Sequence, residues 1–445
     1  MAVAVYAARW VLPIDAAPIE DGEVIVEDGV LAAVRPVQTP ACERRDFGDA
    51  VLMPGLVNAH SHLEYTALRG FLEDVPFFPW IRALTAAKAA LTVEDWLWSA
   101  RLGALECLAA GITTLGDNTD TGVTMRVLAE CGLRGVVYQE LFGIDDREPV
   151  APILDSLRAK VAAHRGLASE RVGVGVSPHA LYTIRPALFA AINDYVAGEG
   201  LPTSIHIAES ASESALTEHG AGPFAEMYAR RGITWEAPKA TPTQYAHDMG
   251  ALGPQTLAVH CVHQTAADIA LLASTGAAII HCPKSNAKLG AGVAPLATWL
   301  RTPGLRLGLG TDSAVSNNAL DLFEEMRFAL LIQRAVQQEV EIVTARDVVR
   351  MATLGGAEAM GLSSRTGSLT PGKRADLIAV RLDRPHAVPA TDPYAALVYA
   401  SRADDVLLTL CNGEMLYDNC LWPTLEAPAI LAGARQAREK LAQGT

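Results

Sequence analysis

The chain carries histidines in a pattern that suits a metal site. His60 and His62 stand one residue apart, at the end of the apolar run VLMPGLVNAH (51–60). Successive side chains of a strand alternate between its two faces, so these two imidazoles would point the same way. A single HxH pair recurs by chance and predicts a metal clamp only when other ligands accompany it.

Further ligands end two later apolar runs. His206 lies in PTSIHIAE (202–209), and Asp312 lies in RLGLGTDS (306–313). Three neutral imidazoles and one carboxylate suit a divalent ion such as zinc, with Fe²⁺ or Mn²⁺ as alternatives, and leave one position for water. Such an ion lowers the pKa of its water from about 16 to roughly 7, so hydroxide becomes available at neutral pH. We therefore expect one divalent metal ion, held by His60, His62, His206 and Asp312.

Two more residues are placed for proton transfer. Glu209 follows His206 by three positions, where the chain leaves the run, and can take the proton of the water and pass it to a substrate. His260, in TLAVHCVH (256–263), is placed to steady the attacking hydroxide or a developing negative charge. We expect Glu209, His260 and Asp312 to be the catalytic residues.

The frame that must position these residues is visible in the middle of the chain. Eight short apolar runs recur there, and amphipathic stretches such as 93–111 and 320–336 separate them. This alternation predicts an α/β protein with a (β/α)₈ barrel. The catalytic face of such a barrel is at the carboxyl ends of its strands. Seven histidines fall at or just after those ends: His60, His62, His179, His206, His260, His263 and His281.

The two ends of the chain have a different pattern. The first fifty residues, and those after 366, alternate short β-rich pieces with turns, as in GEVIVEDGVLAAV (22–34) and DVLLTLCNGEMLYDN (405–419). We expect residues 1–54 and 367–445 to form one composite β-sandwich domain, and residues 55–366 to form the barrel.

Composition restricts the partners. A formal net charge of −14 without a Lys/Arg-rich run argues against a nucleic acid or an anionic membrane, and the N-terminal segment resembles neither a signal peptide nor a membrane span. Seven cysteines without CxxC spacing indicate reduced thiols, as in the cytoplasm. We expect a soluble cytoplasmic protein with a small-molecule partner. Whether it forms a homo-oligomer is left open.

Several motifs, taken in chain order, resemble the amidohydrolase superfamily in its branch of mononuclear-metal aminohydrolases. They are PGLVNAHSH, SPHALYTI, HIAES, HCVH, HCPKSNAKLG, GLGTDS and GSLTPGKRADLIAV. The branch includes cytosine-, guanine- and adenosine-type deaminases and chlorohydrolase-like enzymes. The resemblance covers nearly the whole chain and implies that the residues named above match the family's metal ligands and proton-transfer groups. It also implies that His179, in SPH, contacts the substrate.

The resemblance implies hydrolytic deamination of an amino-substituted heteroaromatic ring. No lysine stands near the end of the fourth predicted strand, where binuclear members carry a carboxylated one, and this favours deamination over cyclic-amide hydrolysis. The expected substrate is an adenine-type nucleoside with a 5′ modification, such as aminodeoxyfutalosine or S-adenosylhomocysteine. The alternatives are a triazine-type chlorohydrolase or aminohydrolase, a guanine or pterin deaminase, and, from another class, an inactive binding barrel.

The remaining substrate contacts are expected near the strand ends. A long loop over residues 64–92 is expected to receive the 5′ group, and its cluster at 77–80 reads equally well as an aromatic lid or as core. For Glu64 and Arg69 in this loop a structural ion pair is an open alternative. Together with His179, the expected contacts are Glu64, Arg69, Glu140 and Asn286.

Overall fold

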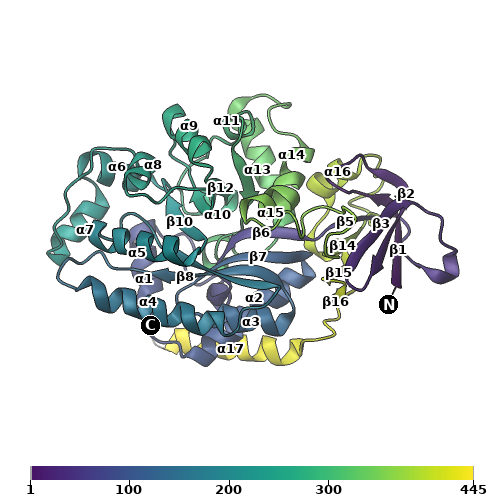
Figure 1. Ribbon diagram of the computed structural model, residues 1–445, viewed down its shortest axis with the longest axis horizontal. Coiled ribbons are helices and arrows are strands. Elements are labelled where there is room, and N and C mark those ends of the chain that lie inside the picture. The colour runs from purple at the N-terminus through teal and green to yellow at the C-terminus, as the bar shows by residue number, and fades with distance from the viewer. Residues whose placement is uncertain (1–2, 444–445) are drawn as a thin grey trace.

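Eight parallel strands form the larger part of the fold. The computed structural model describes residues 3–443, and its ribbon shows the strands surrounded by helices (Figure 1). Neighbours in the sheet follow the chain order without exception, as in a (β/α)₈ barrel. The strands are β6 (Leu56–Ser61), β7 (Ile112–Thr119), β8 (Arg134–Leu141), β9 (Val172–Pro178), β10 (Thr203–Ile207), β11 (Thr256–His260), β12 (Ala278–His281) and β13 (Arg306–Leu309).

The barrel closes beside the predicted metal ligands. Ser61 at the end of β6 forms a parallel bridge with Asp312, which follows β13, and the backbone N–H of Asp312 donates to the carbonyl of His60 at 3.0 Å. All residues of β6, β7 and β8 are buried because helices cover the sheet, and this explains why the strands read as continuous apolar runs. The predicted barrel is confirmed.

Helices fill the connections between the strands. They are η2 (Leu63–Leu68), α1 (Phe77–Lys88), α2 (Val93–Ala109), α3 (Val123–Cys131), α4 (Val150–Arg165), α5 (Pro186–Glu199), α6 (Ala211–His219), α7 (Pro223–Arg231), α8 (Pro242–Asp248), α9 (Ala266–Thr275), α10 (Pro283–Lys288), α11 (Leu296–Leu300), α12 (Ala314–Asn317), α13 (Leu322–Gln337), α14 (Ala345–Arg350), η3 (Met351–Gly355) and α15 (Gly356–Ala359). Within residues 3–443, none has the length and apolar character needed to cross a membrane.

The expected loop over residues 64–92 is wrong as a description of this segment. It contains the short helix η2 and the three-turn helix α1, whose buried residues Trp80, Leu84 and Ala87 recur at helical spacing. The sequence obscured this helix because α1 begins with the bulky FFPW cluster and has no side-chain cap.

The second sheet combines strands from both ends of the chain. Its order is β16-β15-β14-β5-β1-β2-β3, with β4 beside β1, and it is mixed because β1 runs parallel to β5 and antiparallel to β2. The composite character of this part is confirmed (Figure 1). The elements are β1 (Val3–Val11), β2 (Ile19–Glu27), β3 (Val30–Pro36), η1 (Ala41–Glu43), β4 (Arg45–Asp46), β5 (Ala50–Pro54), β14 (Leu377–Arg381), α16 (Pro393–Ala395), η4 (Ala396–Ala400), η5 (Ala403–Asp405), β15 (Val406–Cys411), β16 (Glu414–Asp418) and α17 (Ala427–Gln443).

The run VLMPGLVNAH (51–60) is therefore divided between two sheets. It enters β5 of the mixed sheet and then β6 of the barrel, and Gly55 lies between them. A Cβ at Gly55 would lie 2.2 Å from the side chain of Thr113, so only glycine fits this passage. The break supports a domain boundary near residue 54, although the boundaries 54/55 and 366/367 stay predictions.

Candidate active site

Three histidines meet at the carboxyl ends of the barrel strands and form a metal site. His60 and His62 come from the end of β6 and His206 from β10, and one ligand nitrogen of each lies within 4.8 Å of the others. All three side chains are buried. The parallel arrangement of the strands brings these residues together although β6 and β10 are far apart in the sequence.

The ring nitrogens fit a metal ion. Three ring nitrogens are buried, namely both of His60 and Nδ1 of His62. None of them has a hydrogen-bond partner among residues 3–443. His206 places Nδ1 2.7 Å from the backbone oxygen of His179, which leaves Nε2 for a ligand. Burial lowers the pKa of all three imidazoles, so they are neutral, the form that binds metal.

Asp312 presents one carboxylate oxygen to the same point. The hydroxyls of Ser285 and Ser316 donate to Oδ2 at 2.6 and 2.9 Å. Oδ1 is directed to the histidines and lies 3.5 Å from Nε2 of both His60 and His62. Burial would raise the pKa of Asp312, but the close approach of the imidazoles of His60, His260 and His62 lowers it, and the balance lies well below its usual value. This orientation supports the prediction that Asp312 is the fourth ligand.

A glycine lets the two strand ends approach each other. A Cβ at Gly310 would lie 2.8 Å from the Cβ of His60 and 3.0 Å from the sulfur of Cys282. The GLG segment before Asp312 thus serves close packing of β13 against β6.

A second group of possible ligands shares His206. Glu140, His179 and His206 also place ligand atoms within 4.8 Å of one another. The first group suits a metal better because Asp312 faces it and because both ring nitrogens of His60 have no hydrogen-bond partner among residues 3–443, whereas Nδ1 of His179 is 3.2 Å from the hydroxyl of Thr183. We therefore treat Glu140 and His179 as groups beside the metal site.

Glu209 and His260 lie together next to the histidine cluster. Oε1 of Glu209 is 3.7 Å from Nε2 of His260, and Nδ1 of His260 is 2.8 Å from Oδ1 of Asn286. Burial raises the pKa of Glu209, while the nearby His260 lowers it. A carboxyl group whose pKa is raised by burial accepts a proton more readily than a solvated one does and can then release it to a substrate. The arrangement suits the proton-transfer role expected for Glu209.

Backbone strain is concentrated at these strand ends. Ala208, His260 and Asp312 have φ angles of +52°, +71° and +58°, a region that residues with a Cβ rarely occupy. Each residue follows or ends a strand that supplies the site. Such strain persists where the surroundings fix the backbone and is common at functional sites.

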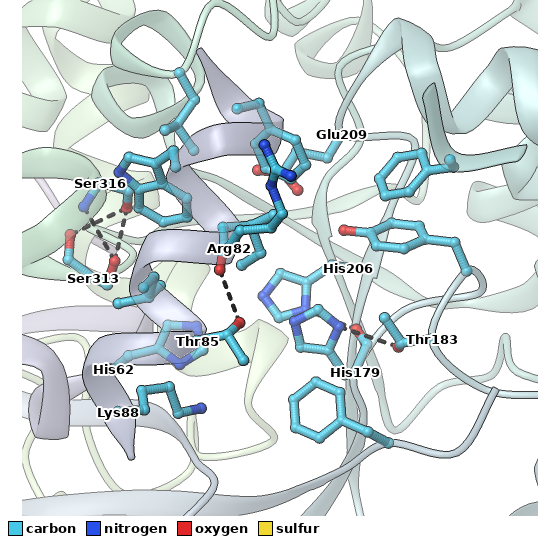
Figure 2. A pocket seen from close by; sticks show the side chains of 18 of the residues that line it. His62, Arg82, Thr85, Lys88, His179, Thr183, His206, Glu209, Ser313 and Ser316 are labelled. Atoms are coloured by element: carbon cyan, nitrogen blue, oxygen red, sulfur yellow. Dashed lines mark hydrogen bonds between the residues drawn. The ribbon is translucent and has the colours of Figure 1, made fainter. Parts of the chain in front are cut away.

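A cavity of about 720 Å³ opens directly over the cluster. Its volume is typical of sites for small molecules. Figure 2 shows His179, His206 and Glu209 pointing into this space, with Arg82 from α1 in front of them. Residues that line it include His62, Tyr65, Phe77, Trp80, Arg82, Lys88, Glu140, Phe142, His179, Tyr182, His206, Glu209, Phe224, Met227, Arg230, Arg231, His260, Leu289 and Asp312.

Two of the five expected substrate contacts line this cavity. They are Glu140 and His179, and burial raises the pKa of Glu140 well above its usual value and lowers that of His179 to about 3. Burial thus favours the neutral form of both groups, and a neutral carboxyl or imidazole can exchange hydrogen bonds with an uncharged ring or sugar.

The other three expected contacts lie elsewhere. Glu64 is buried, does not line the cavity, and accepts hydrogen bonds from Thr119, Asp120 and Thr121. Arg69 is half-exposed and forms an ion pair with Glu106. Asn286 does not line the cavity and contacts the ring of His260 instead. Their places support structural roles for Glu64 and Arg69 and an orienting role for Asn286.

Sequence reasoning missed the cationic side chains of the cavity. Arg82 and Lys88 come from α1, and Arg230 and Arg231 come from α7. The spacing of Phe224, Met227 and Arg231 on one helical face was the available signal. Nothing in the sequence shows that this face turns toward the barrel axis.

Known proteins resemble the chain over its whole length. The model of the Amidohydrolase family matches residues 51–416. A 5-methylthioadenosine/S-adenosylhomocysteine deaminase of Moorella thermoacetica is 34% identical over 437 residues, which are 97% of each chain. A 5′-deoxyadenosine deaminase of Methanothermobacter thermautotrophicus is 32% identical over 96% of each chain.

Solved structures agree with these relatives. An adenosine deaminase from Xanthomonas campestris, determined with bound zinc, superposes with a TM-score of 0.87 at 29% identity and covers 99% of this chain and 98% of its own. Triazine hydrolases at 22–23% identity share the fold, with TM-scores of 0.84 to 0.85. With its barrel, its three-histidine metal site and a family match that spans most of its length, the chain belongs to the amidohydrolase family.

Proposed function

We propose that this protein is a metal-dependent aminohydrolase that deaminates adenine-type nucleosides with a modified 5′ position. The observation that carries the proposal is the Glu209–His260 pair, 3.7 Å apart, beside a histidine cluster at the base of a large cavity. The relatives at 32–34% identity are deaminases of 5′-modified adenosines and support this substrate class.

We propose zinc as the ion at this site. Its ligands would be His60, His62, His206 and Asp312, a donor set that zinc accepts while keeping one position open. The bound zinc of the Xanthomonas campestris deaminase supports this choice. Such an ion makes a water molecule acidic enough to supply hydroxide at neutral pH.

The residues of the chain then move the protons. Deamination adds a water oxygen to C6 of adenine, places a proton on N1, and breaks the C6–N bond to release ammonia and the hypoxanthine nucleoside. Glu209, starting as the carboxylate, takes the proton from the water and gives it to the ring nitrogen; it lies buried beside the cluster, and the pKa that burial raises makes it a stronger proton acceptor. His260, whose Nε2 lies 3.7 Å from Oε1 of Glu209, orients the attacking oxygen.

The walls of the cavity orient the nucleoside. His179 and Glu140, which both line the cavity, offer hydrogen bonds to the purine edge or the ribose. Tyr65, Phe142 and Tyr182 provide flat apolar surface for the ring. Buried surroundings of this kind exclude water and strengthen the polar contacts at the reacting carbon.

The test is a screen of the purified, zinc-loaded protein. Ammonia release and loss of the adenine absorbance band are measured with methylthioadenosine, S-adenosylhomocysteine, 5′-deoxyadenosine and adenosine. Guanine, a pterin and atrazine are the comparison substrates, and Glu209→Gln is the matched inactive control. We expect turnover on the adenosines alone. Activity on the pterin or on atrazine, with none on any adenosine, would overturn the proposal.

The cysteines support a reducing compartment such as the cytoplasm. All seven are free thiols, and five of them are buried. Disulfide bonds are typical of proteins in oxidising compartments, and none joins these cysteines.

A further inference from the structure

The end of β6, which carries two of the metal ligands, is not a regular strand. Its residues 58–61 face only residues 115–117 of β7, so β6 has one residue more than its neighbour there. The two strands approach so closely at this point that a Cβ at Gly116 would lie 2.4 Å from the backbone oxygen of Ala59. A bulge of this kind re-aims the side chains beside it. The regular alternation of side chains along β6 is therefore broken just before His62.

The imidazole of His62 has few contacts that fix its direction. Its ring stacks on the ring of Tyr65 at 5.5 Å and 15°, which restricts tilting but allows movement in the plane of the ring. A metal-binding histidine is usually oriented by a hydrogen bond to its second nitrogen, as Nδ1 of His206 is by the backbone oxygen of His179. Nδ1 of His62 has no such partner among residues 3–443, and an oxygen of Glu140 is 4.0 Å away. The backbone must therefore direct this ring.

Asp117 at the end of β7 holds the residues on both sides of His62. Its Oδ1 accepts a hydrogen bond from the hydroxyl of Ser61 at 2.8 Å and another from the backbone N–H of Leu63 at 2.8 Å. The carboxyl group is buried and does not line the cavity. One oxygen atom thus ties both neighbours of this ligand to a single point of the barrel.

His60, the other ligand of β6, is held by a different strand. Its carbonyl accepts a hydrogen bond from the backbone N–H of Asp312 at 3.0 Å. Two residues before it, the side chain of Asn58 exchanges two hydrogen bonds with Thr311, at 2.8 and 3.0 Å. The contacts with the end of β13 therefore act on the first ligand of the pair, and the second depends on β7.

We propose that Asp117 is a positioning residue of the metal site, which directs the imidazole of His62 to the ion by holding both neighbours of that histidine. The inference rests on the proposed function, because it concerns a ligand of the proposed zinc site. Since Asp117 does not line the cavity, it acts through His62 and not on the substrate. The effective group is the acceptor atom Oδ1, so asparagine, which keeps this atom, should replace Asp117 and alanine should not.

The zinc affinity of the metal-free protein tests the proposal without any substrate. Competition with a chromophoric zinc chelator gives the Kd. Asp117→Ala should raise it by about 10–100-fold, the range observed when the partner of a metal ligand is removed, whereas Asp117→Asn should stay within about threefold of the unmodified protein. Ser61→Ala removes one of the two donors and should raise the Kd by about threefold to tenfold. This variant decides the question if Asp117→Ala does not fold.

Cobalt supplies a second measurement, because the visible absorption of bound Co²⁺ depends on its coordination geometry. The spectrum should change in Asp117→Ala and be kept in Asp117→Asn. Asp405→Ala is the matched control. The buried Asp405, in η5, also uses one oxygen, Oδ2, for two contacts: the backbone N–H of Arg402 donates to it at 2.9 Å, and Nε2 of His386 is 2.8 Å away. This variant should lower the Tm of the metal-free protein but leave the zinc Kd and the cobalt spectrum unchanged.

The outcomes separate this inference from the proposed function. An unchanged zinc Kd and cobalt spectrum in Asp117→Ala overturn the inference, even if the Tm falls, and leave the deaminase proposal intact. An equally large loss of affinity in Asp117→Asn also overturns it, because the charge and not the acceptor contact would then be the cause. If the unmodified protein binds no zinc, both proposals fail. If it binds zinc and deaminates no adenosine, the proposed function alone is refuted.

Discussion

Asn286 holds the imidazole of His260 from the side opposite the cavity, with Oδ1 of the amide 2.8 Å from Nδ1 of the ring. Both side chains are buried, and His260 also has a strained backbone with φ of +71°. The hydrogen bond fixes the ring so that Nε2 faces Glu209. The orientation of His260 thus depends on a residue of α10 that does not itself reach the cavity.

The first prediction concerns this contact. Asn286→Ala should lower kcat by about tenfold, because the ring of His260 loses its orienting partner, while KM and metal content stay nearly unchanged. Asn286→Asp keeps an acceptor oxygen and should recover part of the activity. Steady-state kinetics on both variants make the comparison, and an unchanged kcat in Asn286→Ala would show that the contact is merely structural.

The second prediction concerns the metal. His62→Ala and Asp312→Ala should each lose stoichiometric zinc, because each removes a ligand from a buried site that cannot rearrange around the gap. His263→Ala is the matched control, since the ring of His263 is bound to the backbone oxygen of Ala291 instead. Elemental analysis after dialysis measures the content. Full zinc occupancy in both ligand variants would refute the assignment.

The third prediction concerns Glu209. Glu209→Gln should lower kcat by about 10²–10⁴-fold with metal retained and KM changed far less, because general acid–base catalysis is lost while the shape is kept. If Glu209 only oriented His206, the variant would instead lose metal, and excess zinc would restore turnover. Measuring kcat, KM and metal content on the same preparation separates these roles.

The fourth prediction concerns stability and pH. Glu213 is buried and accepts hydrogen bonds from the backbone N–H groups of Ala208 and Glu209 at 3.1 and 2.9 Å. Burial raises its pKa to about 8. The folded state therefore binds this proton more tightly than the unfolded chain does. The stability that the protonated form contributes is fully present below about pH 4.5, and it is lost as the pH rises through about 8.

Glu213→Gln removes this titration. As the pH rises from about 6 to about 9, the Tm of the variant should rise by about 2 °C relative to that of the unmodified protein. Differential scanning calorimetry at both pH values measures it. Parallel changes of Tm in the two proteins would mean that Glu213 does not titrate in this range.

The barrel could be predicted because its physical signal is strong. Strands covered by helices on one side and packed inside on the other become continuous apolar runs, and eight such runs with polar residues at their ends allow few other folds. The apolar pattern does not separate two strands when no polar residue lies between them. VLMPGLVNAH reads as one strand, since nothing in its composition shows that the chain passes between sheets at Gly55.

The site could be predicted where ligand chemistry fixes the residue type. His60, His62 and His206 belong to this class, and the structure brings them together. Glu64 and Arg69 were expected to contact substrate because they follow the HxH pair, but proximity in sequence does not determine where a side chain points. Arg82 and Arg231 lie on helices whose orientation depends on tertiary packing, so no local pattern identified them.

The mixed sheet also sets an order of assembly during synthesis. β5 is made early, yet one of its neighbours in the sheet is β14, which leaves the ribosome only after the whole barrel has been made. Until then β5 has an unpaired edge, and such edges are templates for wrong pairing with other chains. A chain stopped after residue 366 would carry every proposed metal ligand and still be prone to aggregate. The late pairing of β14 with β5 thus removes an edge that could otherwise pair with other chains.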